Sequence, residues 1–331
     1  MSPATLSPVA LTWGQYIEQL IAERGGLAEL ARCLAEVAPA GLPDDPQTIE
    51  RGIRRLRGRG HLPGEKYGRL LIRCMGIPSP IAAQARELGQ YHSRLSDLPV
   101  PTRRDQLRLW DRPPVSESPL AAWIHIGLAS LAHRSLDAAV IDRRLVLARL
   151  VVRAAGPDAG LELALMEARL LSDRKLREEA TARLDAAEAL LGDTALTADD
   201  AACYFARLQD QRAYLAGRAW ARDRSVLADA LALYQSIPLE GAPPFAAFRR
   251  AHGEGWCMWR LGQPEEGLRH ARLAEQHAGD GGLIRMRIMA LTLQGHILAS
   301  SGGDPEPVQA RARRLAARLD DAQLTRSAGG S

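Results

Sequence analysis

The sequence predicts an all-α fold, and three observations support this prediction. Ala and Leu carry most of the apolar positions in a chain of 331 residues that is 46% hydrophobic, and both residues favour helices. Aromatic residues make up only 5% of the chain, and the alternating Val, Ile and Thr runs that mark strands are nearly absent. Apolar residues recur instead at helical spacing between breaks that contain Gly and Pro.

The first 95 residues are expected to form one helical domain. The pair Asp45-Pro46 is typical of an N-cap followed by a first-turn proline, and Gly25-Gly26 ends the first helix. Helical periodicity places five short helices at residues 11–24, 27–37, about 47–57, 63–76 and about 81–95.

The remaining chain divides into three further segments. Residues 96–118 hold four prolines, many charges and no long apolar period, which predicts a linker between two domains. Residues 119–320 alternate helices of ordinary length with short turns, so they are expected to form a second helical domain. Residues 321–331 are expected to be a flexible tail.

One unit in the second domain has a recognisable repeat pattern. Residues 246–279 place Gly255 where paired helices would cross, Leu261-Gly262 at the turn and Ala274 at a later small position. This unit resembles a tetratricopeptide repeat. Gly217 and Gly295 lie 38 and 40 residues from Gly255, more than the family's usual period of about 34 residues. The resemblance implies a curved α-solenoid whose concave face binds a peptide or a protein partner.

The excess positive charge of the chain lies in its first third. Residues 1–110 contain 15 basic and 11 acidic residues, and the rest of the chain is neutral. The densest basic cluster is at 48–73, where Arg51, Arg54 and Arg55 would line one face of a helix. Ile49, Ile53 and Leu56 would line the opposite face and pack against neighbouring helices.

This region resembles the helix-turn-helix domains of bacterial DNA-binding proteins of the Cro/repressor type. Residues 26–37 are similar to the first helix of the motif, 45–60 to the recognition helix and 63–76 to the closing helix. The turn at 38–45 is about twice the usual three or four residues. The resemblance implies contact with double-stranded DNA through Gln47, Thr48, Arg51, Arg54, Arg55, Arg57 and Arg59. Two other interpretations of the basic cluster are a solvated arginine face and a site for RNA or an acidic protein.

A second candidate site lies on one helix of the repeats. Tyr204, Arg207, Gln211 and Arg212 offer mixed polar and aromatic contacts, which is typical of a peptide- or partner-binding face. Trp256 and Trp259 are expected to pack between repeats.

Other functional classes are disfavoured. The chain has no H-E-x-x-H or G-x-S-x-G motif and no cluster of metal ligands, so no enzyme activity, metal or cofactor is expected. Four separated cysteines without a C-x-x-C pair are typical of thiols in a reducing cytosol. No signal-peptide pattern begins the sequence and no apolar run approaches ~18 residues, so a cytoplasmic protein without membrane contact is expected.

These features together favour a DNA-binding transcriptional regulator whose repeats bind a peptide or protein. The architecture is similar to that of peptide-responsive bacterial regulators, in which ligand alters the geometry of a homodimer. The alternative is an adaptor or scaffold protein with no nucleic-acid role, in which the N-terminal helices cap the solenoid. Exposure of Arg51, Arg54 and Arg55 favours the regulator, whereas ion pairs with Glu50, Asp44 or residues of the repeats favour the adaptor.

Overall fold

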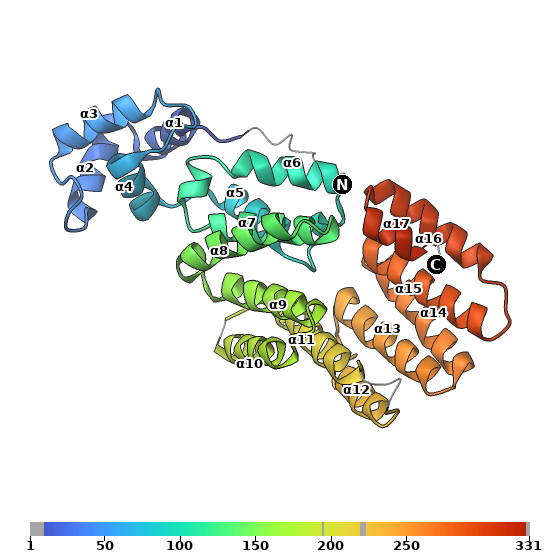
Figure 1. Ribbon diagram of the computed structural model, residues 1–331. Helices are drawn as coiled ribbons and strands as arrows, with labels where there is room; N and C mark the ends of the chain where they lie inside the picture. Colours follow the sequence, from blue (N-terminus) through green and yellow to red (C-terminus); the bar gives the residue numbers. More distant parts are fainter. Residues whose placement is uncertain (1–9, 194, 219–222, 329–331) are drawn as a thin grey trace.

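The computed structural model describes residues 10–193, 195–218 and 223–328. This part of the chain forms 17 α-helices and two short 3-10 helices, and it contains no strand (Figure 1). The predicted all-α class is therefore confirmed.

Four helices form a bundle at one end of the molecule, here called the N-terminal bundle (Figure 1). They are α1 (Trp13–Arg24), α2 (Leu27–Val37), α3 (Pro46–Leu56) and α4 (Glu65–Met75). The Asp45 carboxylate accepts a hydrogen bond of 2.8 Å from the Thr48 amide and so caps α3, as its position before Pro46 predicts. Trp13, Tyr16 and Ile17 of α1 are fully buried at the centre of this bundle.

The segment expected to be a linker contains a packed helix. Three helical elements follow the bundle, namely α5 (Ser79–Gly89), η1 (Arg94–Asp97) and α6 (Val100–Trp110), and η2 (Val115–Glu117) comes next. Leu107 and Trp110 of α6 are buried in a core shared with Ile124 of the following helix. Pro99 and Pro101 do not break this helix because they stand at its start, where no amide donor is required.

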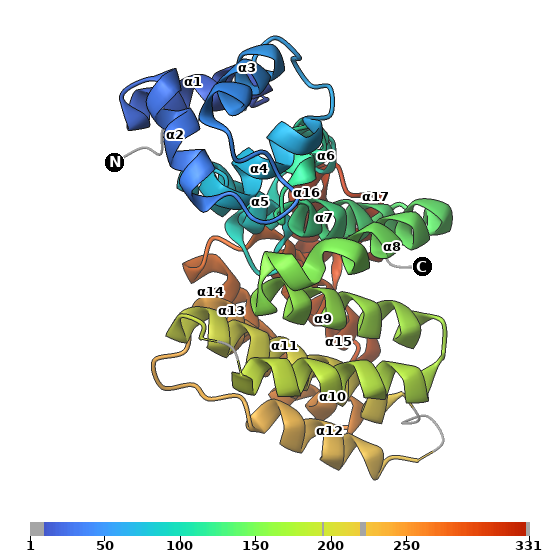
Figure 2. The ribbon, with the colours of Figure 1, turned by 90° about the vertical axis from the view of Figure 1, so that its left-hand side faces the viewer.

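The rest of the chain is an array of antiparallel helix pairs, here called the helix array (Figures 1 and 2). Its members are α7 (Ala121–Arg134), α8 (Ala138–Ala155), α9 (Pro157–Asp173), α10 (Arg177–Asp193), α11 (Ala198–Gly217), α12 (Val226–Gln235), α13 (Pro244–Arg260), α14 (Pro264–Asp280), α15 (Ile284–Ser300) and α16 (Glu306–Leu319). Of the array's described residues, those that line its interior come from the odd-numbered helices and none from an even-numbered one.

Small residues set the crossing of α13 and α14. A Cβ atom on Gly255 would lie 3.0 Å from the carbonyl oxygen of Gly267, and a Cβ on Gly267 would lie 3.0 Å from that of Gly255. Larger side chains at either position would push the two backbones apart. Gly295 similarly faces Gln309 of α16, whereas Gly217 faces the ring of Trp256 on α13.

The array curls until its last helices return to its first. Arg134 at the end of α7 pairs with Asp321 at 3.4 Å, and Arg285 on α15 pairs with Asp97 at 3.0 Å. The segment from 321, expected to be a tail, therefore begins with a buried carboxylate and a short helix, α17 (Ala322–Ala328). Asp321 also caps this helix by accepting hydrogen bonds from the amides of Gln323 and Leu324.

Candidate functional site

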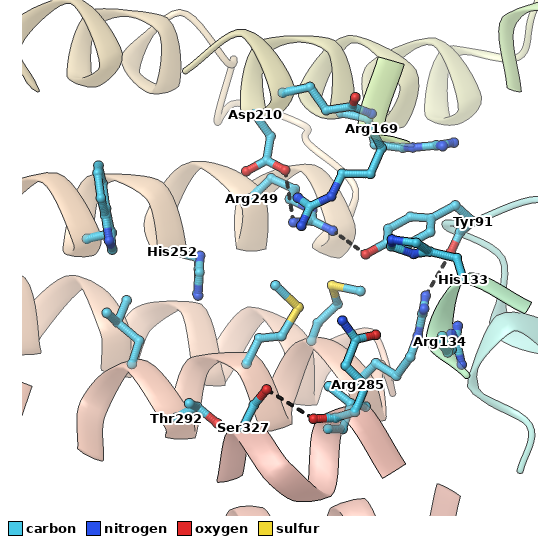
Figure 3. A pocket seen from close by; sticks show the side chains of 18 of the residues that line it. Tyr91, His133, Arg134, Arg169, Asp210, Arg249, His252, Arg285, Thr292 and Ser327 are labelled. Carbon is cyan, nitrogen blue, oxygen red and sulfur yellow. Dashed lines mark hydrogen bonds and ion pairs between the residues drawn. The ribbon is translucent and has the colours of Figure 1, made fainter. Parts of the chain in front are cut away.

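The curled array encloses a cavity of about 420 Å³ (Figure 3). Its walls are the inner faces of α7, α9, α11, α13 and α15. Tyr91, in the loop between α5 and η1, and helix α17 complete the walls. Each of the five inner helices contributes at least one arginine to the cavity, namely Arg134, Arg169, Arg207, Arg249 and Arg285, and α13 adds Arg260.

The carboxylates that pair with several of these arginines lie outside the cavity wall. Glu162 accepts two hydrogen bonds from Arg207, at 2.5 and 2.8 Å, and both side chains are almost fully buried. Asp97 accepts one hydrogen bond of 3.0 Å from the guanidinium of Arg285. Because the guanidinium groups line the cavity and these carboxylates do not, the positive end of each pair faces the interior.

Tyr91 stands among the guanidinium groups (Figure 3). The guanidinium carbon of Arg285 lies 4.6 Å from the centre of its ring, and that of Arg207 lies 4.9 Å away. Burial raises the pKa of Tyr91, but the positive charges of Arg249, Arg285 and Arg134 outweigh it and lower the pKa to about 8. The hydroxyl of Tyr91 is therefore an unusually acidic group at the centre of the array.

Another part of the wall carries large apolar side chains beside Arg260 and His296. Trp256 and Trp259 of α13 line it together with Met286 and Met289 of α15. Burial, helped by the charge of Arg249, lowers the pKa of nearby His252 to about 4, so this imidazole is neutral at physiological pH. The cavity thus joins a cationic side to an apolar side with adaptable thioethers.

Comparison with protein-family models, curated proteins and solved structures finds no match for this chain. Function therefore has to be inferred from the side chains themselves.

The residues predicted to bind a partner separate onto different faces of α11. Arg207 and Gln211 line the cavity, because positions four apart share a helical face. Tyr204 is buried behind the wall and packs edge-on against His92 at 4.6 Å. Arg212 turns to the outer layer, where it pairs with Glu188 at 2.7 Å and with Asp185 at 2.9 Å.

Sequence reasoning did not identify the other inner arginines or Tyr91. A signal is nevertheless present, because successive inner arginines follow each other after 35 to 42 residues, once per helix pair. The expected packing role of Trp256 holds in part, since its ring covers Gly217 while it also borders the cavity.

The second candidate site is the outer face of α3. Ile49, Ile53 and Leu56 are buried as predicted, and the opposite face is exposed. Thr48, Arg51, Arg54 and Arg55 surround an open depression on this face, and Gln47 is exposed beside it.

The arginines of this region differ in how firmly they are held. Arg54 pairs with Glu50 at 2.5 Å, yet 65% of its side chain remains exposed. Arg51 donates to the carbonyl of Gln47 within the same helix. Arg57 pairs with Glu18, and Arg59 donates to the carbonyl of Pro63 at 2.7 Å, so these two bind back onto the N-terminal bundle.

The described part of the chain offers neither a metal site nor a membrane span. No three His, Cys, Asp or Glu side chains gather there as they would to hold a metal ion. No helix within those residues combines the length and hydropathy that a membrane span requires.

Proposed function

We propose that this chain is a cytoplasmic, DNA-binding transcriptional regulator. In this proposal α2 and α3 act as a helix-turn-helix and bind double-stranded DNA. The helix array acts as a tetratricopeptide-like solenoid that binds a peptide or protein effector, and the regulator works as a homodimer. The observation that carries the proposal is the outer face of α3, where Arg51, Arg54 and Arg55 are exposed together while the apolar face is buried.

The chemistry of that face suits a nucleic acid. Guanidinium groups pair with backbone phosphates and can bind guanine edges through two donors. Helix α3 lies in the bundle at one end of the molecule, apart from the helices of the array (Figure 1). Leu30 and Leu34 of α2 share a core with Ile49 and Ile53 of α3, so the long turn between these helices does not separate them.

A direct connection between the bundle and the array supports control by an effector. The Gly64 amide donates to the Glu117 carboxylate at 2.9 Å, and His61 Nδ1 lies 3.1 Å from the carbonyl oxygen of Pro113. Glu117 belongs to η2, which packs against α7, the first inner helix of the array. Movement of α7 would therefore reach the bundle through this short path.

The test is binding of the purified chain to mixed-sequence double-stranded DNA over a salt series. The variant carries Ala at Arg51, Arg54 and Arg55, and its matched control carries Ala at three exposed arginines of the outer helices, Arg183, Arg269 and Arg318. Wild type and control should bind with steep salt dependence. The plot of log affinity against log salt should be shallower by about 2 to 3 in the α3 variant, because each lost phosphate contact removes about 0.9.

An adaptor without a nucleic-acid role remains the second candidate function, and one observation favours it. Arg54 pairs with Glu50, which would lower the charge that α3 offers to DNA. Exposed pairs of this kind contribute about 0–1 kcal/mol, so a phosphate could displace the carboxylate. Absence of wild-type DNA binding at low salt would leave the adaptor as the better proposal.

A further inference from the structure

We propose that the cavity of the helix array is a binding site for a small organic anion with an apolar body. The acidic group would lie against the guanidinium groups of Arg134, Arg169 and Arg249, and the apolar body against Trp256 and Met289. This inference deepens the proposed function by naming the chemistry of the effector, and it rests on that function only in treating the ligand as an effector.

The size of the cavity selects the class of ligand. A volume of about 420 Å³ falls within the ~300–1,000 Å³ of pockets that hold small organic molecules. Helix α17 and Tyr91 border the cavity, so the array does not present the long open groove that an extended partner helix would need. An organic acid or a peptide of a few residues would fit this volume, which narrows the proposed peptide or protein effector to a small one.

The charge of the wall selects an anion. Among the described residues, six arginines line the cavity and two carboxylates do, those of Asp210 and Asp321. Arg249 is 5% exposed, and its Nε atom is buried with no hydrogen-bond partner among the described residues. A buried donor of this kind costs free energy until an acceptor reaches it. An anionic ligand would supply that acceptor in surroundings where charge interactions are weakly screened.

Arg169 is the cation best placed to meet a ligand. Its side chain is 42% exposed, whereas Arg134 and Arg249, the other two arginines proposed to meet the acidic group, are almost fully buried. Its partner Asp173 lies 3.3 Å away and is shared with His133, which lies 2.9 Å from the same oxygen. Asp173 would keep His133 as a hydrogen-bond partner if Arg169 turned toward a ligand.

The apolar wall accounts for the rest of the ligand. The indole of Trp259 stacks on His296 with ring centres 6.2 Å apart, and its Nε1 donates to Ser300 at 2.7 Å. The guanidinium carbon of Arg260 also lies 3.7 Å from the centre of this ring, so Trp259 is held firmly in the wall of the cavity. Met286 and Met289 can adjust their rotamers around an aromatic or aliphatic group.

The experiment compares two fluorescent probes with the same skeleton. One is 8-anilinonaphthalene-1-sulfonate, an aromatic anion, and the other is N-phenyl-1-naphthylamine, which lacks the sulfonate. The full-length chain should bind the anion at one saturable site, and more tightly than the neutral probe. Arg169→Gln should weaken anion binding about tenfold, the loss expected for one charge-assisted hydrogen bond, and should leave the neutral probe unchanged.

A matched variant controls for nonspecific charge effects. Arg174→Gln removes a neighbouring arginine that pairs with Asp142 outside the cavity, and it should bind both probes as the wild type does. Equal binding of both probes that Arg169→Gln does not alter would overturn the proposal, and so would equal losses in the two arginine variants.

A second pair of variants keeps the test decisive if Arg169→Gln folds poorly. Thr292 lines the cavity, and Thr292→Glu and Thr292→Gln add side chains of the same size that differ in charge. The carboxylate should weaken binding of the anion more than tenfold relative to the amide, whereas the neutral probe should not distinguish them. Identical anion binding by both would contradict an anion site. Neither assay contains DNA, so failure here leaves the salt-series result for α3 intact, and the reverse also holds.

Discussion

The hydroxyl of Tyr91 accepts a hydrogen bond of 2.8 Å from Nη2 of Arg249. Nη1 of the same guanidinium lies 3.0 Å from Asp210, so Arg249 joins a carboxylate of α11 to a tyrosine that follows α5. The backbone of Tyr91 is held as well, because its amide donates to Glu162 and its carbonyl accepts from Arg285. The chain that leaves the N-terminal region is thus fixed by the inner arginines of the array (Figure 3).

This relationship predicts a stability that depends on pH in the alkaline range. The pKa of Tyr91 is lowered from 10.0 to about 8, so the folded state releases this proton at lower pH than the unfolded chain does. The stabilisation is fully present above pH 10 and is lost as the pH falls through 8. Between neutral pH and pH 10, the unfolding free energy of wild type should rise by about 2–3 kcal/mol relative to Tyr91→Phe.

Urea unfolding of both proteins across that range measures the difference. A spectroscopic control accompanies it, because burial raises the pKa values of Tyr16, Tyr204 and Tyr234 and these side chains do not ionise in the same window. A tyrosinate absorbance change near pH 8 should therefore appear in the wild type and be missing from Tyr91→Phe. A stability difference that stays constant with pH would show that Tyr91 contributes only its hydrogen bond.

Asp321 has two roles that substitutions can separate. It pairs with the buried guanidinium of Arg134 and it caps α17. Asp321→Asn keeps a capping oxygen but removes the charge, whereas Asp321→Ala removes both. We expect Asn to destabilise the α17 contact by leaving Arg134 without its carboxylate, and Ala to cost about 1 kcal/mol more for the lost cap.

Amide hydrogen exchange of residues 322–328 reports this directly. Exchange should increase in the order wild type, Asn, Ala, while the helices of the N-terminal bundle keep their protection. Equal exchange in all three proteins would mean that α17 is held by its apolar contacts, such as those of Leu324, and not by Asp321.

Gly253 shows how tightly α12 and α13 pack. A Cβ atom at this position would lie 2.1 Å from the ring of Tyr234, whose hydroxyl donates to Asp210 at 3.2 Å. The ring cannot move aside without losing that hydrogen bond, so Gly253→Ala should lower the unfolding free energy by about 1–3 kcal/mol.

Gly160 on α9 provides the opposite case in the same experiment. A Cβ there meets only the side chain of Leu190, at an ordinary contact distance of 3.5 Å. Gly160→Ala should therefore raise the unfolding free energy by about 0.5–1 kcal/mol through helix propensity. Thermal unfolding measures both variants, and a destabilised Gly160→Ala would contradict the packing described around α9.

Local patterns predicted the N-terminal region well. The start of α3 follows from Asp45 and Pro46, and its buried face follows from the spacing of Ile49, Ile53 and Leu56. The prolines at 99 and 101 misled the interpretation of 96–118, because a proline that starts a helix and one that breaks it look alike in sequence.

The candidate cavity was harder to predict because its residues are far apart in the chain. Periodicity identifies a shared face within one helix, which is how Arg207 and Gln211 were found. It does not show that Arg134, Arg249 and Tyr91 meet, since their distances depend on the curvature of the whole array. That curvature arises from many small helix-crossing angles, which a single sequence does not specify.

In a linear stack of helix pairs, each pair touches only its neighbours, so the outermost pairs can fray without disturbing the middle. The ion pairs Arg134–Asp321 and Arg285–Asp97 remove that freedom by linking the beginning of the stack to its end. Neither end of the helix array can unfold alone, because its unfolding would leave the charged partner at the other end buried without its ion pair. The helix array should accordingly unfold as one cooperative unit. The steepness of its thermal transition would then reflect the whole array and not its least stable helix pair.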